Sequence, residues 1–208
     1  MNVAVLASGS GTNLQALLDA DEAKTLEARI LLVVSNRGSA GALDRARKAG
    51  REALHLSPSM FATEEEYSDR LLQELVGRDI QLVCLAGYLK KLPPAVVSAF
   101  AGRLLNIHPA PLPRFGGDGM YGQHVHEAVL KAGVPQSGPT VHFVDQNYDT
   151  GPVVAHVPVP VLATDTPESL AARVLEAEHR LYPRAVAAVA AGRIRLVNGR
   201  VEGRLDAT

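Results

Sequence analysis

Short apolar runs alternate with helical patterns in the first half of the chain. The apolar runs span residues 2–7, 28–36, 51–56, 80–87 and 103–109. Between the first two runs, Leu14, Leu17 and Leu18 recur at the spacing of one helical face. Before the fourth run, Thr63 and Glu66 predict a capping box for another helix. Because continuous apolar runs separated by helices are typical of parallel strands covered on both faces, we expect an α/β fold.

The pattern changes after residue 115. A glycine-rich loop precedes a helical segment at residues 124–133, and two further apolar runs follow at 139–145 and 151–161. Their short polar connection permits a hairpin, so the sheet should continue with antiparallel strands. A long C-terminal helix should begin after the cap Thr166, and Pro183 should kink or interrupt it. We expect one domain, residues 1–208, with a mostly parallel, mixed sheet flanked by helices and two unequal lobes.

Composition narrows the functional classes. The 208 residues carry a formal net charge of −1, which argues against a protein whose main role is to bind nucleic acid. No apolar run approaches the roughly 20 residues of a membrane-spanning helix, and the first residues resemble a strand more than a leader. We therefore expect a cytoplasmic protein, monomer or homodimer, with no nucleic-acid or membrane partner. The single cysteine, Cys84, lies in an apolar run and should be buried.

A glycine-rich stretch, LASGSGTNLQ, links the first strand to the first helix. Gly9 and Gly11 allow a tight turn, and the amides of Thr12 and Asn13 would open the helix where an anion is favoured. The dinucleotide fingerprint is not met, because Leu14 occupies its third glycine position, and the P-loop pattern is absent. The stretch therefore favours a single phosphate group over a dinucleotide, with a plain tight turn as the alternative.

Polar residues at the end of the fifth strand are the main candidates for chemistry. Asn106 and His108 are two positions apart, so an extended segment points both side chains to the carboxyl edge where ligands bind in open α/β sheets. Asparagine can donate to a developing oxyanion, and histidine can move a proton near neutral pH. Asp149 would orient the imidazole and raise its pKa if the hairpin packs beside this strand. A loop-capping pair is the alternative interpretation.

The remaining polar residues are weaker candidates for a functional site. No serine or cysteine is placed as an activated nucleophile, which favours direct attack of one substrate on the carbonyl of another. His124 and His126 lack the accompanying carboxylate or cysteine spacing of a metal site, so no metal is expected. His142 and His156 are interpreted as packed residues of their strands.

Six segments, occurring in order, carry a resemblance to a known family. They are VLASGSGTNLQALL, LAGYLKKL, LLNIHPAPLP, GMYGQHVHEAVL, SGPTVHFVDQNYDTGPVV and ARVLEAEHRLYP. Together they resemble the folate-dependent phosphoribosylglycinamide formyltransferases over about residues 2–195. The resemblance implies a Rossmann-like formyltransferase fold, 10-formyltetrahydrofolate as co-substrate, and no metal. It also implies that the glycine amine of 5-phosphoribosyl-glycinamide attacks the formyl carbon.

The resemblance further implies site residues. Asn106 and His108 would stabilise the oxyanion and assist proton movement, while Asp149 would keep His108 oriented and charged. Residues 1–105 would form the half that binds the phosphate and nucleotide, and residues 106–208 the folate-binding and catalytic half. The nucleotide would contact Gly11, Thr12 and Asn13 through its phosphate and Glu178 through its ribose. The folate would contact Leu89, Lys90, Lys91, Leu92, Val144 and Asp145. Relatives often carry a basic residue where this chain has Glu64, and Lys90 or Lys91 could replace it.

Other functions remain open at this stage. Methionyl-tRNA formyltransferase would need an additional C-terminal domain, and formyltetrahydrofolate deformylase an N-terminal regulatory domain, and neither is expected in 208 residues. From a different class, an NADP-binding reductase could use Arg37 for the extra phosphate, but Leu14 counts against it. A non-catalytic binding module is the remaining alternative, and the Asn106, His108 and Asp149 set argues against it.

Overall fold

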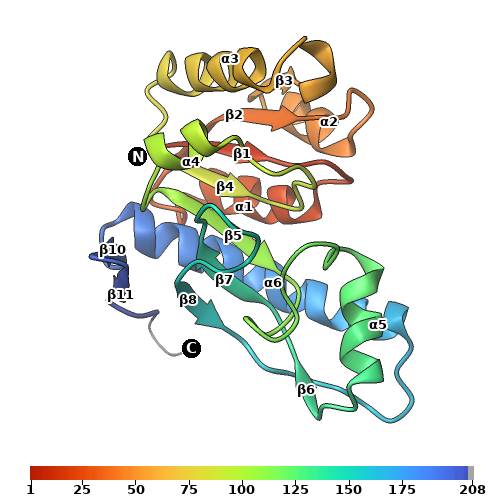
Figure 1. Ribbon diagram of the computed structural model, residues 1–208. Coiled ribbons are helices and arrows are strands. Elements are labelled where there is room, and N and C mark those ends of the chain that lie inside the picture. The colour runs from red at the N-terminus through yellow and green to blue at the C-terminus, as the bar shows by residue number, and fades with distance from the viewer. Residues whose placement is uncertain (206–208) are drawn as a thin grey trace.

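A seven-stranded sheet forms the centre of the molecule (Figure 1). The computed structural model describes residues 1–205. Strands follow the order β3-β2-β1-β4-β5-β7-β8 across the sheet. Their bounds are β1 Asn2–Leu6, β2 Arg29–Ser35, β3 Glu52–His55, β4 Leu82–Leu85, β5 Leu104–His108, β7 Thr140–Phe143 and β8 Val153–His156. The first five pair in parallel, whereas β7 and β8 are antiparallel to their neighbours, as the sequence predicts.

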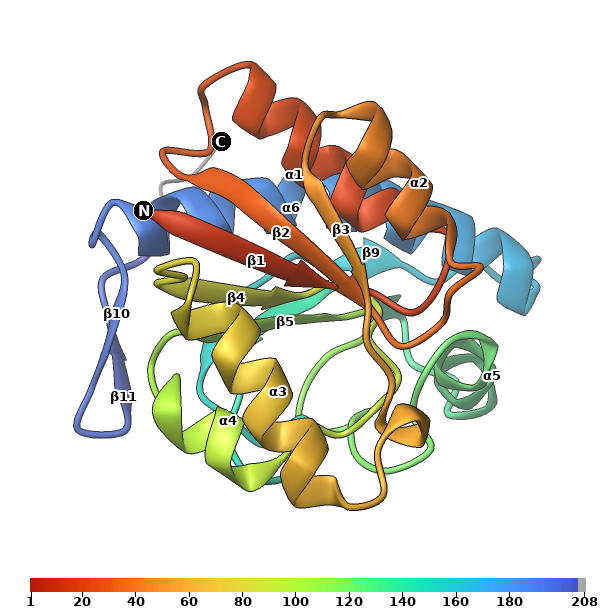
Figure 2. The same cartoon turned by 90° about the horizontal axis from the view of Figure 1, so that it is seen from above.

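Helices cover both faces of the sheet (Figure 2). One face carries α1 Thr12–Glu22, α2 Gly41–Lys48 and the long α6 Pro167–Ala190. The other face carries α3 Glu64–Val76 and α4 Pro94–Ala99. Beyond the sheet, α5 Gln123–Lys131 packs against α6. Short elements complete the fold: the turn η1 Pro58–Met60, the pair β6 Gln136–Ser137 with β9 Val159–Pro160, and the pair β10 Arg195–Val197 with β11 Arg200–Glu202.

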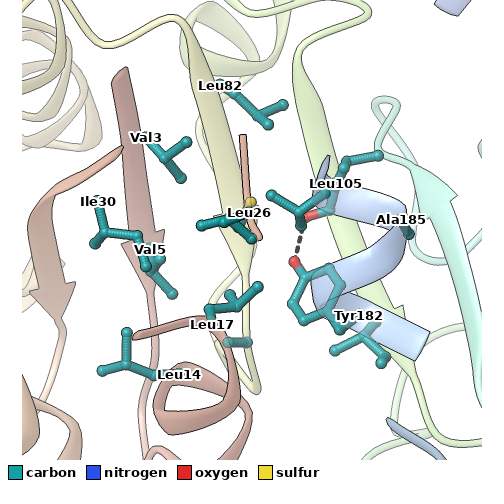
Figure 3. Close-up of a cluster of buried hydrophobic side chains, with 14 of the residues drawn as sticks. Val3, Val5, Leu14, Leu17, Leu26, Ile30, Leu82, Leu105, Tyr182 and Ala185 are labelled. Carbon is teal, nitrogen blue, oxygen red and sulfur yellow. Dashed lines mark hydrogen bonds between the residues drawn. The ribbon is translucent and has the colours of Figure 1, made fainter. Parts of the chain in front are cut away.

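Alternation along the strands explains why both faces are apolar. In β1, Val3 and Val5 contribute to the cluster beneath α1 and α6, whereas Ala4 and Leu6 contribute to the cluster beneath α3 and α4. Figure 3 shows the first cluster, in which the Tyr182 ring of α6 lies among these side chains. Its hydroxyl donates to the carbonyls of Leu85 and Leu105, at 2.8 and 3.2 Å. These bonds join α6 to the β4–β5 centre of the sheet.

Most elements agree with the sequence expectations, and the exceptions have physical causes. Thr63 caps α3 by accepting from the Glu66 N–H, as predicted, but the reciprocal half of the capping box is absent, because Glu66 accepts from the Ala62 N–H instead. Pro183 does not interrupt α6, because Tyr182, Ala185 and Val186 are buried on either side of it and packing holds the helix together. The sequence analysis did not identify α4 or the β10–β11 hairpin, since both are short and lack a clear period. Cys84 is buried, as expected. Among the helices of residues 1–205, none has both the length and the apolarity to span a bilayer.

Candidate functional site

The site is built on the polar face of β5 and its antiparallel neighbour β7. In β5, Leu105 and Ile107 join the core beneath α6, so Asn106 and His108 point to the opposite face. The β5–β7 register places His142 opposite Asn106. His108 and His142 are buried, at 3% and 2% relative exposure, so these polar groups need partners inside the protein.

Asp149 supplies the common partner. It lies in the loop between β7 and β8, in the left-handed region at φ 55°. Its Oδ2 is 3.5 Å from Nδ1 of His108, and its Oδ1 is 3.4 Å from Nδ2 of Asn106. The structure thus brings together the three side chains that the sequence analysis selected, although His108 and Asp149 are 41 positions apart in the sequence.

A turn at residues 115–117 contacts both the imidazole and the carboxylate. Because a carbonyl can only accept, Nε2–H of His108 donates to the Phe115 carbonyl at 2.7 Å. The Gly117 N–H donates to Oδ2 of Asp149 at 3.0 Å. Between them, a Cβ added at Gly116 would lie 2.8 Å from the Cβ of Asp149, so only glycine allows this approach. The turn therefore sets the tautomer of His108 and the position of Asp149 together.

Electrostatics corrects one expectation about His108. Burial lowers the pKa of His108 below its ordinary value, although the nearby Asp149 carboxylate opposes the shift. The sequence analysis expected a raised pKa and a charged ring; desolvation outweighs the carboxylate instead. Burial also tends to raise the pKa of Asp149, but its contacts with His142, the neighbouring His108 and the Gly117 N–H bring it below its usual range. A neutral imidazole beside an ionised carboxylate can accept a proton and then be stabilised as the cation.

His142 belongs to the same cluster, which the sequence analysis missed when it interpreted this residue as packing. Its Nδ1 donates to the Phe143 carbonyl at 2.8 Å, which leaves Nε2 of the neutral ring as an acceptor. That nitrogen lies 3.1 Å from Nδ2 of Asn106 and 3.5 Å from Oδ1 of Asp149. The usable signal was alternation: Thr140 and His142 are the polar positions of a strand that is otherwise apolar.

These side chains line a cavity of about 280 Å³. The segment 87–92 and residues 144, 145 and 147–149 form one part of its wall, and Asn13 and Glu178 form another. All six residues predicted for the folate line it, namely Leu89, Lys90, Lys91, Leu92, Val144 and Asp145. Lys91 places its Nζ 5.6 Å from the centre of the Tyr148 ring at the rim. Glu64 does not line this cavity.

At the part of the cavity wall formed by Asn13 and Glu178, the beginning of α1 meets α6. Gly11 is the N-cap, at φ 77°, and no side chain caps the helix, so its first N–H groups have no side-chain acceptor there. Asn13 lines the cavity and donates from Nδ2 to Oε2 of Glu178 at 2.5 Å. Burial raises the pKa of Glu178 to about 7, although the bond from Asn13 opposes this. Thr12 instead lines a separate, shallower hollow with Arg45 and His179.

The other histidines do not join the site directly. His124 is exposed and lies 3.7 Å from Glu127. His126 is buried on α5, and its Nδ1 has no hydrogen-bond partner among residues 1–205. Within that same range, no three His, Cys, Asp or Glu side chains are arranged so that they could hold a metal ion.

Comparison with known proteins identifies the protein family. Residues 1–186 match the formyl transferase family, and the chain belongs to that family. It is 40% identical over 196 residues to phosphoribosylglycinamide formyltransferase of Escherichia coli (strain K12), covering 94% of this chain and 90% of the bacterial protein. It is 42% identical over 198 residues to the trifunctional purine biosynthetic protein adenosine-3 of Drosophila pseudoobscura pseudoobscura, covering 94% of this chain but only 14% of that protein.

Solved structures agree with this assignment. Glycinamide ribonucleotide transformylase 1 from Symbiobacterium toebii superposes with a TM-score of 0.91 at 41% identity, covering 99% of this chain and 94% of the other. A formyltetrahydrofolate deformylase from Pseudomonas syringae pv. tomato superposes with a TM-score of 0.86 at 22% identity, over 98% of this chain and 65% of the other. This second likeness concerns the fold alone.

Proposed function

We propose that the protein transfers the formyl group of 10-formyltetrahydrofolate to the amine of 5-phosphoribosyl-glycinamide, giving N-formylglycinamide ribonucleotide and tetrahydrofolate. The observation that carries this proposal is the convergence of Asn106, His108 and Asp149 in one cavity. That cavity is bordered on one part by Asn13 and Glu178 and on another by the segment 87–92. Two substrates could therefore meet at the three side chains.

The side chains have complementary roles in the proposed reaction. The substrate amine attacks the formyl carbon, and the carbonyl oxygen becomes an oxyanion to which the Asn106 amide donates. His108 is largely neutral before reaction, so its Nδ1 accepts the proton released from the attacking nitrogen. Asp149, at 3.5 Å, then stabilises the imidazolium. The proton passes to the folate nitrogen as the carbon–nitrogen bond to the folate breaks.

Residues 1–105 and 106–208 both contribute to the two substrate sites in this proposal. Residues 1–105 supply the loop at Gly11, Thr12 and Asn13, where the first N–H groups of α1 favour a phosphate. Glu178, from the second half, contacts the ribose hydroxyls beside Asn13. The folate lies along the segment Leu89–Leu92, with Val144 and Asp145 across the cavity, and Lys90 or Lys91 offers a cation to its acidic tail.

Turnover of the two purified substrates tests the proposal. Tetrahydrofolate release should require both of them, and Asn106→Ala or His108→Ala should lower kcat by at least about 100-fold while the fold survives. His124→Ala is the control, because this exposed histidine lies outside the cavity. Unimpaired turnover in both variants would place the chemistry elsewhere. Equal release without the glycinamide substrate would indicate hydrolysis of the formyl-folate instead.

A further inference from the structure

The loop that leads into α1 lacks the apolar contact that commonly fixes the start of a helix. Gly11 is the N-cap, which places Ser10 immediately before the cap and Gln15 at the fourth helical position. In many helices these two positions hold apolar residues whose contact fixes the angle at which the chain enters the helix. Here both are polar, and the glycine between them adds no side chain of its own. Something else must hold the loop in place.

Arg45 of α2 bridges the same two positions. Its Nε donates to the Ser10 carbonyl at 2.8 Å, and its Nη1 donates to Oε1 of Gln15 at 3.0 Å. The amide of Gln15 is fixed in turn, because its Nε2 donates to Oδ1 of Asp19 at 2.7 Å. One planar guanidinium therefore joins the loop before α1 to the second turn of α1.

The backbone of α2 supports this bridge by direct contact. A Cβ added at Gly11 would lie 2.7 Å from the Cα of Ala42, and one added at Gly41 would lie 3.0 Å from the Ser10 carbonyl oxygen. The Ala42 N–H also donates to the Gly9 carbonyl at 3.2 Å. α1 and α2 lie side by side on this face of the sheet (Figure 2), with Arg45 one turn beyond Gly41.

We propose that Arg45 is a positioning residue for the phosphate of the nucleotide substrate. The inference rests on the proposed function and deepens it. The guanidinium binds the Ser10 carbonyl, whose partial negative charge would otherwise act on a neighbouring phosphate dianion. By bridging to Gln15, it also keeps the first N–H groups of α1 in a fixed orientation before the phosphate arrives. Arg45 thus assists phosphate binding through the loop and takes no part in formyl transfer.

Kinetics of matched variants tests this role. Arg45→Met keeps the length of the side chain and removes its donors. It should raise KM for the phosphorylated glycinamide substrate by about tenfold, the effect of losing roughly one charge-assisted contact. kcat and KM for the formyl-folate should stay within about twofold. Arg45→Lys should recover part of the loss, because one ammonium can still reach the Ser10 carbonyl. Arg47→Met is the control, since Arg47 is exposed on the same helix and pairs with Asp44.

Two competitive inhibitors distinguish a loss of phosphate binding from a general loss of substrate binding. Arg45→Met should weaken inhibition by ribose 5-phosphate by about tenfold and leave inhibition by the dephosphorylated glycinamide riboside unchanged. Unchanged inhibition by ribose 5-phosphate would overturn the proposal, and so would equal weakening of both inhibitors or a matching fall in kcat. If the unmodified protein shows no formyl transfer, the proposed function itself fails. Normal transfer with no selective effect of Arg45→Met overturns only the role of Arg45.

Discussion

Replacing Glu178 by glutamine should change how the stability of the protein depends on pH. Glu178 is 7% exposed on α6, and Nδ2 of Asn13 donates to it. Burial raises its pKa from 4.5 to about 7 in the folded protein. Between these values the folded protein holds a proton that the unfolded chain has lost, so the free energy of unfolding falls as pH rises through this window.

The size of the effect follows from the shift. A difference of about 2.5 pH units corresponds to about 3–4 kcal/mol, because each unit is worth about 1.4 kcal/mol. Most of this, about 2–3 kcal/mol, is lost between about pH 5 and about pH 8. Glu178→Gln keeps an acceptor for Asn13 but cannot ionise. The variant should therefore gain stability relative to the unmodified protein as pH rises, by up to this amount.

Urea unfolding at several pH values measures the effect. The difference in unfolding free energy between the variant and the unmodified protein cancels other titrating groups that the two share. Glu176→Gln is the matched control for the substitution itself, since Glu176 is exposed on the same helix. The reasoning about Glu178 is refuted if the difference for Glu178→Gln does not change between about pH 5 and about pH 8.

Three further predictions concern the site and the core. Asp149→Asn should lower kcat/KM and move the acidic limb of its pH–rate profile to lower pH, because the Asp149 carboxylate opposes the lowering of the His108 pKa. An acidic limb at an unchanged pH would contradict this. Gly116→Ala should reduce kcat more than it changes either KM, since its Cβ would displace Asp149, and steady-state kinetics with near-normal kcat would count against it. Tyr182→Phe should lower the free energy of unfolding by about 1–3 kcal/mol, because the buried hydroxyl that donates to the Leu85 and Leu105 carbonyls is lost. Urea titration would show this, and an unchanged midpoint would rule out that role.

The parts of the fold that sequence could predict are those with a strong period. The five parallel strands and the β7–β8 hairpin follow from apolar runs and turn signals, and so does the start of α6 at its Thr166 cap. The sequence did not predict α4 or the β10–β11 hairpin, because α4 has six residues and each strand of the hairpin has three, too few to show a period. The pKa direction of His108 could not be predicted, since it depends on how completely the cavity walls exclude water.

The site itself could be partly predicted because its residues break the apolar pattern of buried strands. β5 and β7 each alternate, with apolar side chains directed to the core beneath α6. The polar positions then share the other face, and antiparallel pairing sets Asn106 against His142 and His108 against Thr140. Residues from one strand were recognised and those from the other were not, because a cross-strand register cannot be read from either strand alone. A polar alternation in two adjacent buried strands therefore predicts one shared cluster once their pairing is known.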